Sequence, residues 1–423
     1  MARFLHIADI HLGFDRYDSP ERTKDFFYAL YDVLERYAVQ ERVDFVAIAG
    51  DLFEHRNIQP SVLSHARLCL KLLKEAHIPA IAIEGNHDNC PYGTSTSWLR
   101  YLSDWDFLIL LEPGNLNKGE PFYSPWDGKR GGYIDLDCGV RVIGSNWYGS
   151  AAPQAIEQMA AALKTLPPGP AHTVALFHHG LEGQIARYSG ALRYKEALPL
   201  KDAGVDYLAL GHIHKTYSEG GWIYNPGSLE ANNIEESGYR RGAYLVELSG
   251  SNITASLKQD YRQRPCIRLS LVAKGQETIE DLERLALETV QNAMAEQRLI
   301  PAQQPIVELR IGGQVGFDRL ELDTRKLQKV LQDLSQALIF LLKYDVDETA
   351  YGSPVAQDAS RLEIEQEVFT DLLSANSIYK SSAGTLAQGL IDLKDRHLEG
   401  DDESILYKQA QAILSKAQAA KSK

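Results

Sequence analysis

Cysteine is scarce in this chain, and its few copies lie far apart. The 423 residues include only 4 cysteines, Cys69, Cys90, Cys138 and Cys266, and none of them forms a C-x-x-C pair. This spacing indicates neither a zinc ribbon nor a disulfide framework. A reduced, cytoplasmic setting is the simplest one that fits.

Long apolar runs are missing as well. No run approaches the roughly 20 residues of a membrane-spanning helix, and the N-terminal stretch MARFLHIADIHLG lacks the layout of a signal peptide. We therefore expect no membrane association. Hydrophobic residues still make up 44% of the chain, which suits a globular protein with a sizeable core. The length allows two or three domains.

Positive charge is in deficit, because the formal net charge is −13. This balance argues against a chain that coats nucleic acid nonspecifically, since neutralising phosphates needs clustered Lys and Arg. It excludes neither a local basic track nor an acidic active site that meets phosphates through bound cations.

The first part of the chain, to about residue 260, alternates short β-rich runs with helical patterns. Helices are expected over 21–40 and 60–78, where apolar residues recur at helical spacing. The order strand, helix, strand predicts an α/β layered core. Strands are expected at 3–8, 44–49, 79–84, 140–145, 173–178, 206–211 and 242–248.

The pattern changes near residue 262. A strand within 261–272, a helix over 278–297, a strand over 305–313 and a helix over 323–343 predict a small α+β module. A linker over 351–360 follows, and then three amphipathic helices near 361–375, 382–397 and 402–419. The predicted domains are therefore 1–262, 263–350 and 351–423.

Polar clusters follow five of the predicted strands. In open α/β sheets, ligands gather outside the carboxyl ends of the strands, so these clusters are expected to meet at one edge. Carboxylate oxygen, amide oxygen and imidazole nitrogen suit divalent manganese, iron or zinc. Two such cations about 4 Å apart can activate a shared water and clamp phosphoryl oxygens. The clusters are Asp9 and His11; Asp51; Asn86, His87 and Asp88; His178 and His179; and His212 and His214.

The motifs D-x-H, G-D, G-N-H-D, an isolated His and G-H-x-H, in this order, resemble those of the calcineurin-like metallophosphoesterases. The surrounding stretches FLHIADIHLG, VDFVAIAGDLF, IPAIAIEGNHD, YLALGHIH and YNPGSLE are similar to the bacterial SbcD family of DNA repair exonucleases. The resemblance covers roughly residues 3–260, rests on layout over 265–350, and is only positional for the C-terminal helices. It implies a two-sheet metallophosphoesterase sandwich flanked by helices, then a small α+β capping domain and a helical C-terminal segment.

This resemblance also implies roles for the clustered residues. It favours two divalent metals, with manganese ahead of iron and zinc, and a water as nucleophile. His87 would be the acid that protonates the leaving oxygen, and Asp88 would hold its imidazole in orientation. The implied ligands are Asp9, His11 and His214 for one metal, Asn86, His178 and His212 for the other, and Asp51 as the bridge.

Other polar residues keep two interpretations. Glu54 would contact a metal-bound water or position His87, or else it would cap the following turn. His55, next to it, is expected to face solvent. Because adjacent strand residues point to opposite faces, we predict His178 rather than His179 as the ligand.

The arginines near the domain junction also have two possible interpretations. Arg262 and Arg264 form either a solvated linker face or a track that contacts DNA phosphates.

His6, within the first strand, is predicted to be a buried, hydrogen-bonded histidine. The apolar stripes of the C-terminal helices either pack on their own domain or dock on a partner. In the resembled family, such a segment grips the coiled-coil base of an SMC-like ATPase of the SbcC type.

The leading expectation is a metal-dependent DNA nuclease that acts in DNA repair and recombination. The resemblance suggests a homodimer, 3′-to-5′ exonuclease action on duplex ends and endonuclease action on single strands or hairpins. One alternative is a phosphatase or phosphodiesterase for small phosphate compounds on the same two-metal core, which the metal motifs alone do not separate. The other alternative is a non-catalytic scaffold for the ATPase, against which the intact ligand set argues.

Overall fold

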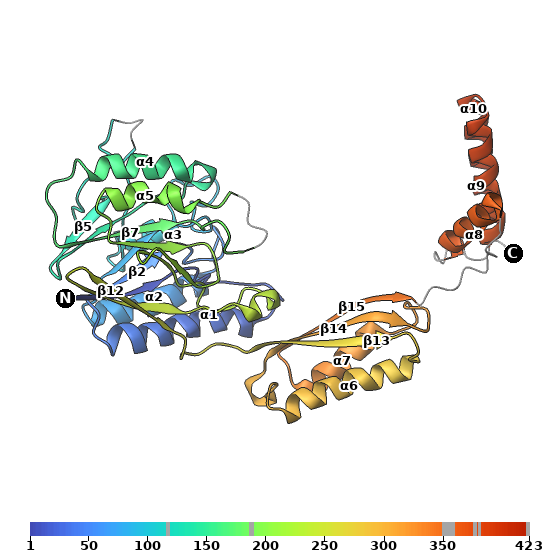
Figure 1. The fold of residues 1–423 in the computed structure, drawn as a ribbon, viewed down its shortest axis with the longest axis horizontal. Helices are drawn as coiled ribbons and strands as arrows, with labels where there is room; N and C mark the ends of the chain where they lie inside the picture. Colours follow the sequence, from blue (N-terminus) through green and yellow to red (C-terminus); the bar gives the residue numbers. More distant parts are fainter. Residues whose placement is uncertain (116–118, 186–189, 349–359, 375–378, 380–381, 420–423) are drawn as a thin grey trace. The chain divides into compact units, whose positions relative to one another are not determined.

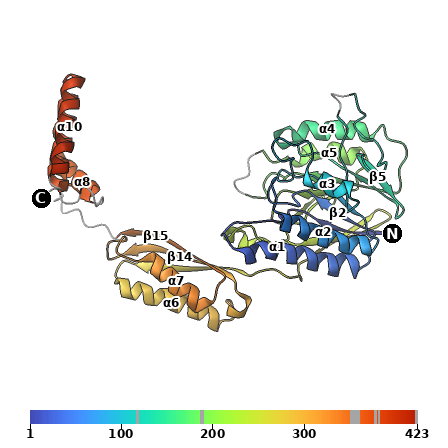
Figure 2. The same cartoon turned by 180° about the vertical axis from the view of Figure 1, so that it is seen from behind.

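The computed structural model describes residues 1–115, 119–185, 190–348, 360–374, 379 and 382–419. Its fold confirms the predicted class, a mixed α/β architecture with two six-stranded sheets flanked by helices (Figures 1 and 2). The described chain separates into two compact units. One comprises Met1–Leu271, Leu282–Ile311 and Asp323–Tyr344, and the other comprises Val272–Asp281, Gly312–Leu322 and Asp345–Lys423.

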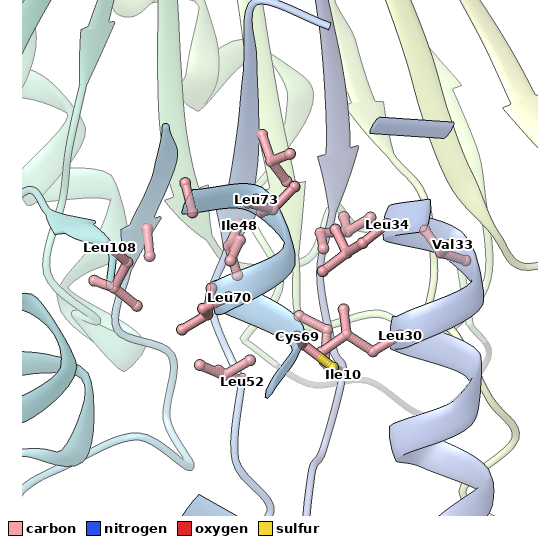
Figure 3. Packing of buried hydrophobic residues seen from close by; sticks show 14 of the residues in the cluster. Ile10, Leu30, Val33, Leu34, Ile48, Leu52, Cys69, Leu70, Leu73 and Leu108 are labelled. Carbon is pink, nitrogen blue, oxygen red and sulfur yellow. The ribbon is translucent and has the colours of Figure 1, made fainter. Parts of the chain in front are cut away.

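The first sheet has the order β12-β11-β1-β2-β3-β4. Its strands are β1 (Ala2–Ile7), β2 (Phe45–Ala49), β3 (Ala80–Ile83), β4 (Ile109–Leu110), β11 (Ala243–Ser249) and β12 (Asn252–Lys258). Strands β1 to β4 are parallel, and β11 and β12 add an antiparallel edge. The sheet packs against α1 (Pro20–Val33), the π-helical turn Leu34–Val39 and α2 (Pro60–Glu75). Figure 3 shows this packing, in which Leu70 and Leu73 lie near Ile48 and Leu30 lies near Ile10 and Cys69.

The second sheet has the order β5-β6-β7-β8-β10-β9. Its strands are β5 (Tyr133–Leu136), β6 (Val140–Ile143), β7 (His172–His178), β8 (Tyr207–Gly211), β9 (Tyr217–Glu219) and β10 (Ile223–Asn225). The helices α4 (Ala152–Leu163) and α5 (Tyr194–Asp202) cover its outer face (Figure 1). Between the sheets lies a separate core that includes Phe4, Ala47, Val174 and Leu176. The short helix α3 (Trp98–Asp104) precedes β4.

A three-stranded sheet, β13-β14-β15, follows the sandwich in sequence. The elements are β13 (Cys266–Lys274), α6 (Ile279–Ala295), β14 (Ile306–Val315), α7 (Thr324–Ser335) and β15 (Ile339–Glu348). The prediction of one helix over 323–343 is wrong in its second half. Gln336 adopts a left-handed φ of 51°, which ends α7, and the apolar run that follows becomes strand β15.

Three helices end the described chain, close to their predicted positions. They are α8 (Arg361–Ser374), α9 (Ala383–Leu398) and α10 (Glu403–Ala419). The linker predicted over 351–360 lies outside the described residues except for Ser360. The predicted boundary at residue 262 falls between β12 and β13, and the domain boundaries stay predictions. Among the described helices, none has the length and apolar character to cross a membrane.

Candidate metal centre

The predicted polar residues meet at the carboxyl edges of the two sheets. Asp9 and His11 follow β1, Asp51 follows β2, Asn86 and His87 follow β3, His178 ends β7, and His212 and His214 follow β8. Four of these side chains, Asp9, His11, Asp51 and His178, are at most 2% exposed. Charged groups are rarely buried this deeply without a partner, so the edge calls for a compensating charge.

The backbone at this edge is unusual. Asp9, His11, Asp51 and His212 have φ angles of 51°, 52°, 52° and 87°, all in the left-handed region. Non-glycine residues adopt this region at a cost of about 1–3 kcal/mol each, and they tend to do so at functional sites. The turns after β1 and β2 also bind each other, because the amides of Ile10 and His11 both donate to the carbonyl of Asp51.

Gly50 allows the chain to come close to the second sheet at this point. Its φ is +91°, and a Cβ atom there would lie 2.4 Å from Nδ1 of His178. Gly85 faces the same restriction, because its Cβ would lie 2.1 Å from Oδ1 of Asp51. Two glycines therefore let the strand ends approach closely enough for their neighbours to share a site.

The first group of candidate ligands comprises Asp9, His11 and His214, whose ligand atoms all lie within 4.8 Å of one another. The Nε2 atoms of His11 and His214 face each other at 3.2 Å. Both oxygens of Asp9 accept the backbone N–H of His212 at 2.9 Å, which fixes the carboxylate beside the second group. These three residues are the predicted first set.

The second group comprises Asp51, His178 and His212, again within 4.8 Å. Oδ2 of Asp51 lies 3.1 Å from Nε2 of His178. Oδ1 of Asn86 lies 3.1 Å from the same nitrogen and 2.8 Å from Nδ1 of His212. The amide of Asn86 thus points at both imidazoles, as a ligand of the predicted second set would.

His87 touches both groups. Its backbone N–H donates to Oδ1 of Asp51 at 2.8 Å, and its ring lies edge-on to His11 with centroids 5.0 Å apart. Its Nδ1 lies 2.6 Å from the carbonyl oxygen of Glu54. Asp88 does not make the contact predicted for it, since its carboxylate accepts the N–H groups of Leu52, Phe53 and Gly85 at 3.2, 3.0 and 3.0 Å. Asp88 therefore fixes the loops around the site, and the contact to the His87 ring comes from Glu54.

Glu54 faces the centre and its neighbour does not. Oε2 of Glu54 lies 2.8 Å from Nδ1 of His11, whose side chain is only 1% exposed. His55 instead pairs with Asp15 at 3.1 Å, and both of these side chains are exposed. Of the two interpretations of Glu54, the site-facing one agrees with this geometry, although the ring that its carboxylate meets is that of His11.

The charges at the centre shift the pKa values of its histidines. Burial lowers the pKa of His178, but the Asp51 and Asp9 carboxylates and the Ala49 carbonyl together outweigh burial and raise it to about 9. Burial likewise lowers the pKa of His214, and its contact with Glu236 raises it to about 9. The pKa of His212 falls to about 3, first through burial and then through the charge of His178. Without a cation, the edge attracts protons to two of its imidazoles, and a cation would displace them.

Two other histidines have structural contacts. His6 is buried, with Nδ1 2.9 Å from the Tyr207 hydroxyl and Nε2 3.0 Å from the Leu210 carbonyl, as predicted for a core histidine. Burial lowers its pKa to about 3. His179 has Nε2 3.1 Å from the carbonyl of Gly149, and its own Nδ1 accepts the N–H of Gly180. His179 belongs to neither ligand group among the described residues.

The two arginines predicted as DNA contacts have different surroundings. Arg264 donates through Nε and Nη2 to both oxygens of Asp25, and through Nη1 to the carbonyls of Gln303 and Gln304. These contacts occupy all three nitrogens of the guanidinium, so Arg264 is poorly suited to contact DNA. Arg262 is exposed, and its guanidinium lies over the Tyr28 ring at 3.8 Å from the centroid.

Sequence reasoning missed Glu236, which lies in the 3-10 turn Ile234–Gly238. Its Oε1 is 3.1 Å from Nδ1 of His214, and its Oε2 accepts the N–H of Asn232 at 2.9 Å. No motif spacing marks a glutamate 22 residues after the histidine that it contacts. Only the folding of the loop after β10 brings the two together.

Comparisons with known proteins agree with this geometry. The family model "Calcineurin-like phosphoesterase" matches residues 2–216, a span that includes every candidate ligand. The chain is 26% identical over 357 residues to "DNA double-strand break repair protein Mre11" of Archaeoglobus fulgidus, covering 80% of this chain and 76% of that protein. It is 30% identical over 257 residues to the protein of the same name in Saccharolobus solfataricus, covering 59% of this chain and 61% of that one.

A bacterial protein is also similar to this chain. The "Uncharacterized metallophosphoesterase YhaO" of Bacillus subtilis is 26% identical over 266 residues, covering 59% of this chain and 58% of that protein. These similarities support the DNA repair nuclease branch that the motifs indicate. Because the family model spans residues 2–216 and the candidate ligands converge within that span, the chain belongs to the calcineurin-like phosphoesterase family.

Proposed function

We propose that this protein is a two-metal DNA nuclease that hydrolyses phosphodiester bonds in DNA repair and recombination. One observation carries the proposal: two groups of largely buried candidate ligands lie at one edge, and His87 contacts a member of each. The similarity to proteins named for double-strand break repair supports DNA as the substrate. The 3′-to-5′ polarity and the single-strand endonuclease action rest on the motif resemblance.

The donor set fits two divalent cations. Asp9, His11 and His214 would hold one, and His178, His212 and Asn86 the other, with Asp51 as the shared carboxylate. Carboxylate, amide and imidazole donors without cysteine suit manganese, which we propose as the native metal. When bound, such a pair neutralises charge on the phosphoryl oxygens and lowers the pKa of a water between the cations.

The protein's own contribution centres on His87. The Glu54 carbonyl beside Nδ1 orients the ring and favours the tautomer with hydrogen on that nitrogen. Nε2 then carries the second proton when the ring is charged, and this proton is the one available to the leaving oxygen. Asp88 keeps the loops after β2 and β3 together through its three backbone hydrogen bonds, and so holds His87 at a fixed distance from Asp51.

The test uses purified full-length protein with Mn²⁺ and three substrates. These are end-labelled duplex DNA, single-stranded DNA and a small chromogenic phosphate ester. We expect cleavage of both DNA substrates, and its loss in Asp51→Ala. Hydrolysis of the ester without cleavage of DNA, with or without an ATPase partner, would identify a small-phosphate hydrolase and overturn the proposal.

For DNA contacts, we propose Arg262 and no longer Arg264. An exposed guanidinium beside an aromatic ring can meet a phosphate, whereas Arg264 is engaged by Asp25. Arg262→Glu should weaken DNA binding and reduce its salt dependence by roughly one phosphate contact. Unchanged salt dependence in this variant would remove Arg262 from the DNA surface.

We also propose that the C-terminal helices bind a coiled-coil ATPase of the SMC-like type. Apolar side chains line a cavity of about 420 Å³ between α9 and α10, among them Leu390, Leu393 and Leu406. Deleting residues 355–423 should abolish ATPase binding while leaving Mn²⁺-dependent hydrolysis. Retained complex formation would refute the assignment.

Two further parts of the proposal concern assembly and location. The homodimer comes from the motif resemblance, and the mass of the protein in solution tests it directly. The cytoplasmic setting agrees with four cysteines that are all free. Labelling of these thiols in freshly lysed cells would test it, because a disulfide-forming compartment would block them.

A further inference from the structure

The two imidazoles of the first ligand group are arranged as a facing pair. His11 lies in the loop after β1 of the first sheet, and His214 lies in the loop after β8 of the second. Their Nε2 atoms lie 3.2 Å apart. Each ring therefore offers Nε2 to the space beside Asp9 and turns Nδ1 away from it. The acceptor at each Nδ1 influences how strongly that ring binds a cation through Nε2.

Behind His214 lies Glu236, which is only 8% exposed. Its Oε1 is 3.1 Å from Nδ1 of His214. The glutamate is itself held, because its carboxylate accepts the N–H of Asn232 at 2.9 Å and the side-chain amide of Asn233 at 2.8 Å. The side chain of Arg241 adds a hydrogen bond to the Glu236 carbonyl. Glu236 is thus a fixed carboxylate aimed at the ring.

Behind His11 lies Glu54. Its Oε2 is 2.8 Å from Nδ1 of His11, and both atoms are buried. Among the described residues, neither atom has an aligned hydrogen bond, so the two form a close ion-pair contact and have no competing partner. Both rings of the facing pair are therefore backed by a carboxylate.

In the second ligand group, the described contact behind His178 is of another kind. Nδ1 of His178 lies 2.8 Å from the carbonyl oxygen of Ala49, a neutral acceptor. Nδ1 of His212 faces the amide oxygen of Asn86. This nitrogen therefore lies among the candidate ligand atoms. An imidazole whose N–H is accepted by a carboxylate is more basic and better oriented than one that donates to a neutral carbonyl.

We propose that Glu54 and Glu236 are positioning residues that make the Asp9, His11 and His214 group the tighter of two divalent-cation positions. The two positions would then fill in order, the carboxylate-backed one first. This inference rests on the proposed metal centre, and it adds which position fills first and which residues decide it. It requires neither glutamate to touch the cation or the DNA.

The test is a calorimetric titration of the metal-free full-length protein with Mn²⁺, without DNA. The wild type should show two binding events of different affinity. Glu54→Gln and Glu236→Gln should each weaken the tighter event by about 10–100-fold and leave the weaker one in place. Glu236→Asp, which keeps the charge, should recover part of the loss.

Glu308→Gln is the matched control. Glu308 is also a buried, ion-paired glutamate, with Arg268 and Lys343 as partners, but it lies on β14 outside both ligand groups. The control should leave both events unchanged. Its thermal unfolding without metal, compared with that of the two test variants, shows whether any loss of binding comes from loss of folding.

Three results would overturn the inference. They are unchanged Mn²⁺ binding in both glutamine variants, equal weakening of both events, and loss of a whole equivalent of Mn²⁺ in Glu54→Gln. The last would make Glu54 a ligand, together with His11 and His87. Because no DNA is present, two ordered Mn²⁺ events in a protein that fails to cleave DNA would refute the nuclease and leave this inference standing.

Discussion

The carboxyl edge of the sandwich and the C-terminal helices depart from ordinary burial in opposite directions. At the edge, charged side chains such as Asp9 and Asp51 are almost wholly buried. In the helices, large apolar side chains are exposed, with Leu362 at 52%, Leu372 at 65% and Tyr407 at 80%. Buried charge and exposed apolar surface are the two informative exceptions to normal burial. The first agrees with the cations that we propose for the edge, and the second agrees with the protein partner that we propose for the helices.

The comparison predicts that the two regions can be disabled separately. The largest expected effect is at the edge. His87→Ala should lower kcat for DNA hydrolysis by about 10²–10⁴-fold, the usual contribution of a general acid. Binding of Mn²⁺ and of the ATPase should not change, because His87 belongs to neither proposed ligand set. Single-turnover kinetics and a parallel Mn²⁺ titration measure both, and a kcat close to wild type would exclude His87 as the acid.

Next in size is an effect on the stability of the first compact unit, which contains both Asp25 and Arg264. Arg264→Ala should lower the free energy of unfolding by about 2 kcal/mol, because it removes charge-assisted hydrogen bonds to Asp25. Arg22 still pairs with that carboxylate at 3.1 Å, which limits the loss. Urea denaturation measures it. Arg262→Ala, which removes only an exposed contact with Tyr28, is the control, and equal losses in the two variants would contradict the assignment.

A smaller effect is expected at the helices. Leu372→Asp places a charge on the exposed apolar face of α8 and should weaken ATPase binding about tenfold, equivalent to about 1.4 kcal/mol. Hydrolysis should be unaffected. A binding assay with the ATPase attached to a sensor surface would measure this loss of affinity. Glu367→Gln, on the same helix, controls for a general effect of altered charge, and a variant that loses hydrolysis instead would break the separation between the two regions.

The effect with the smallest slope builds up gradually with pH, and it concerns a buried histidine that has no place in the metal centre. The pKa of His6 is lowered by burial from 6.5 to about 3, so between these values the unfolded chain binds a proton that the folded chain does not. The free energy of unfolding should therefore fall as pH decreases through this window, by at most about 1.4 kcal/mol per pH unit from this residue. His6→Gln should flatten the slope in urea denaturation, and an unchanged slope would show that His6 does not cause it.

The meeting of the candidate ligands at one edge could be predicted from the sequence, because each lies at or just after the end of a β-rich run and parallel strands bring their carboxyl ends together. The partners behind those ligands could not. Glu236 reaches His214 only through a loop after β10, and Asp88 turns to three backbone amides although it adjoins His87. The strand β15 was predicted as helix because its apolar run continues the helical pattern of α7. Arg264 looked like a basic surface residue because Asp25, its partner, is 239 positions away.

The left-handed turns at the edge have a consequence for engineering. Asp9, His11, Asp51 and His212 occupy conformations that glycine adopts without penalty. Glycine at some of these positions could therefore relieve local strain while removing a ligand. A laboratory selection for heat resistance alone would then favour variants that have lost the centre, since nothing in such a selection rewards the strained conformation. Thermostable forms of this protein are best sought under a simultaneous requirement for divalent-metal binding.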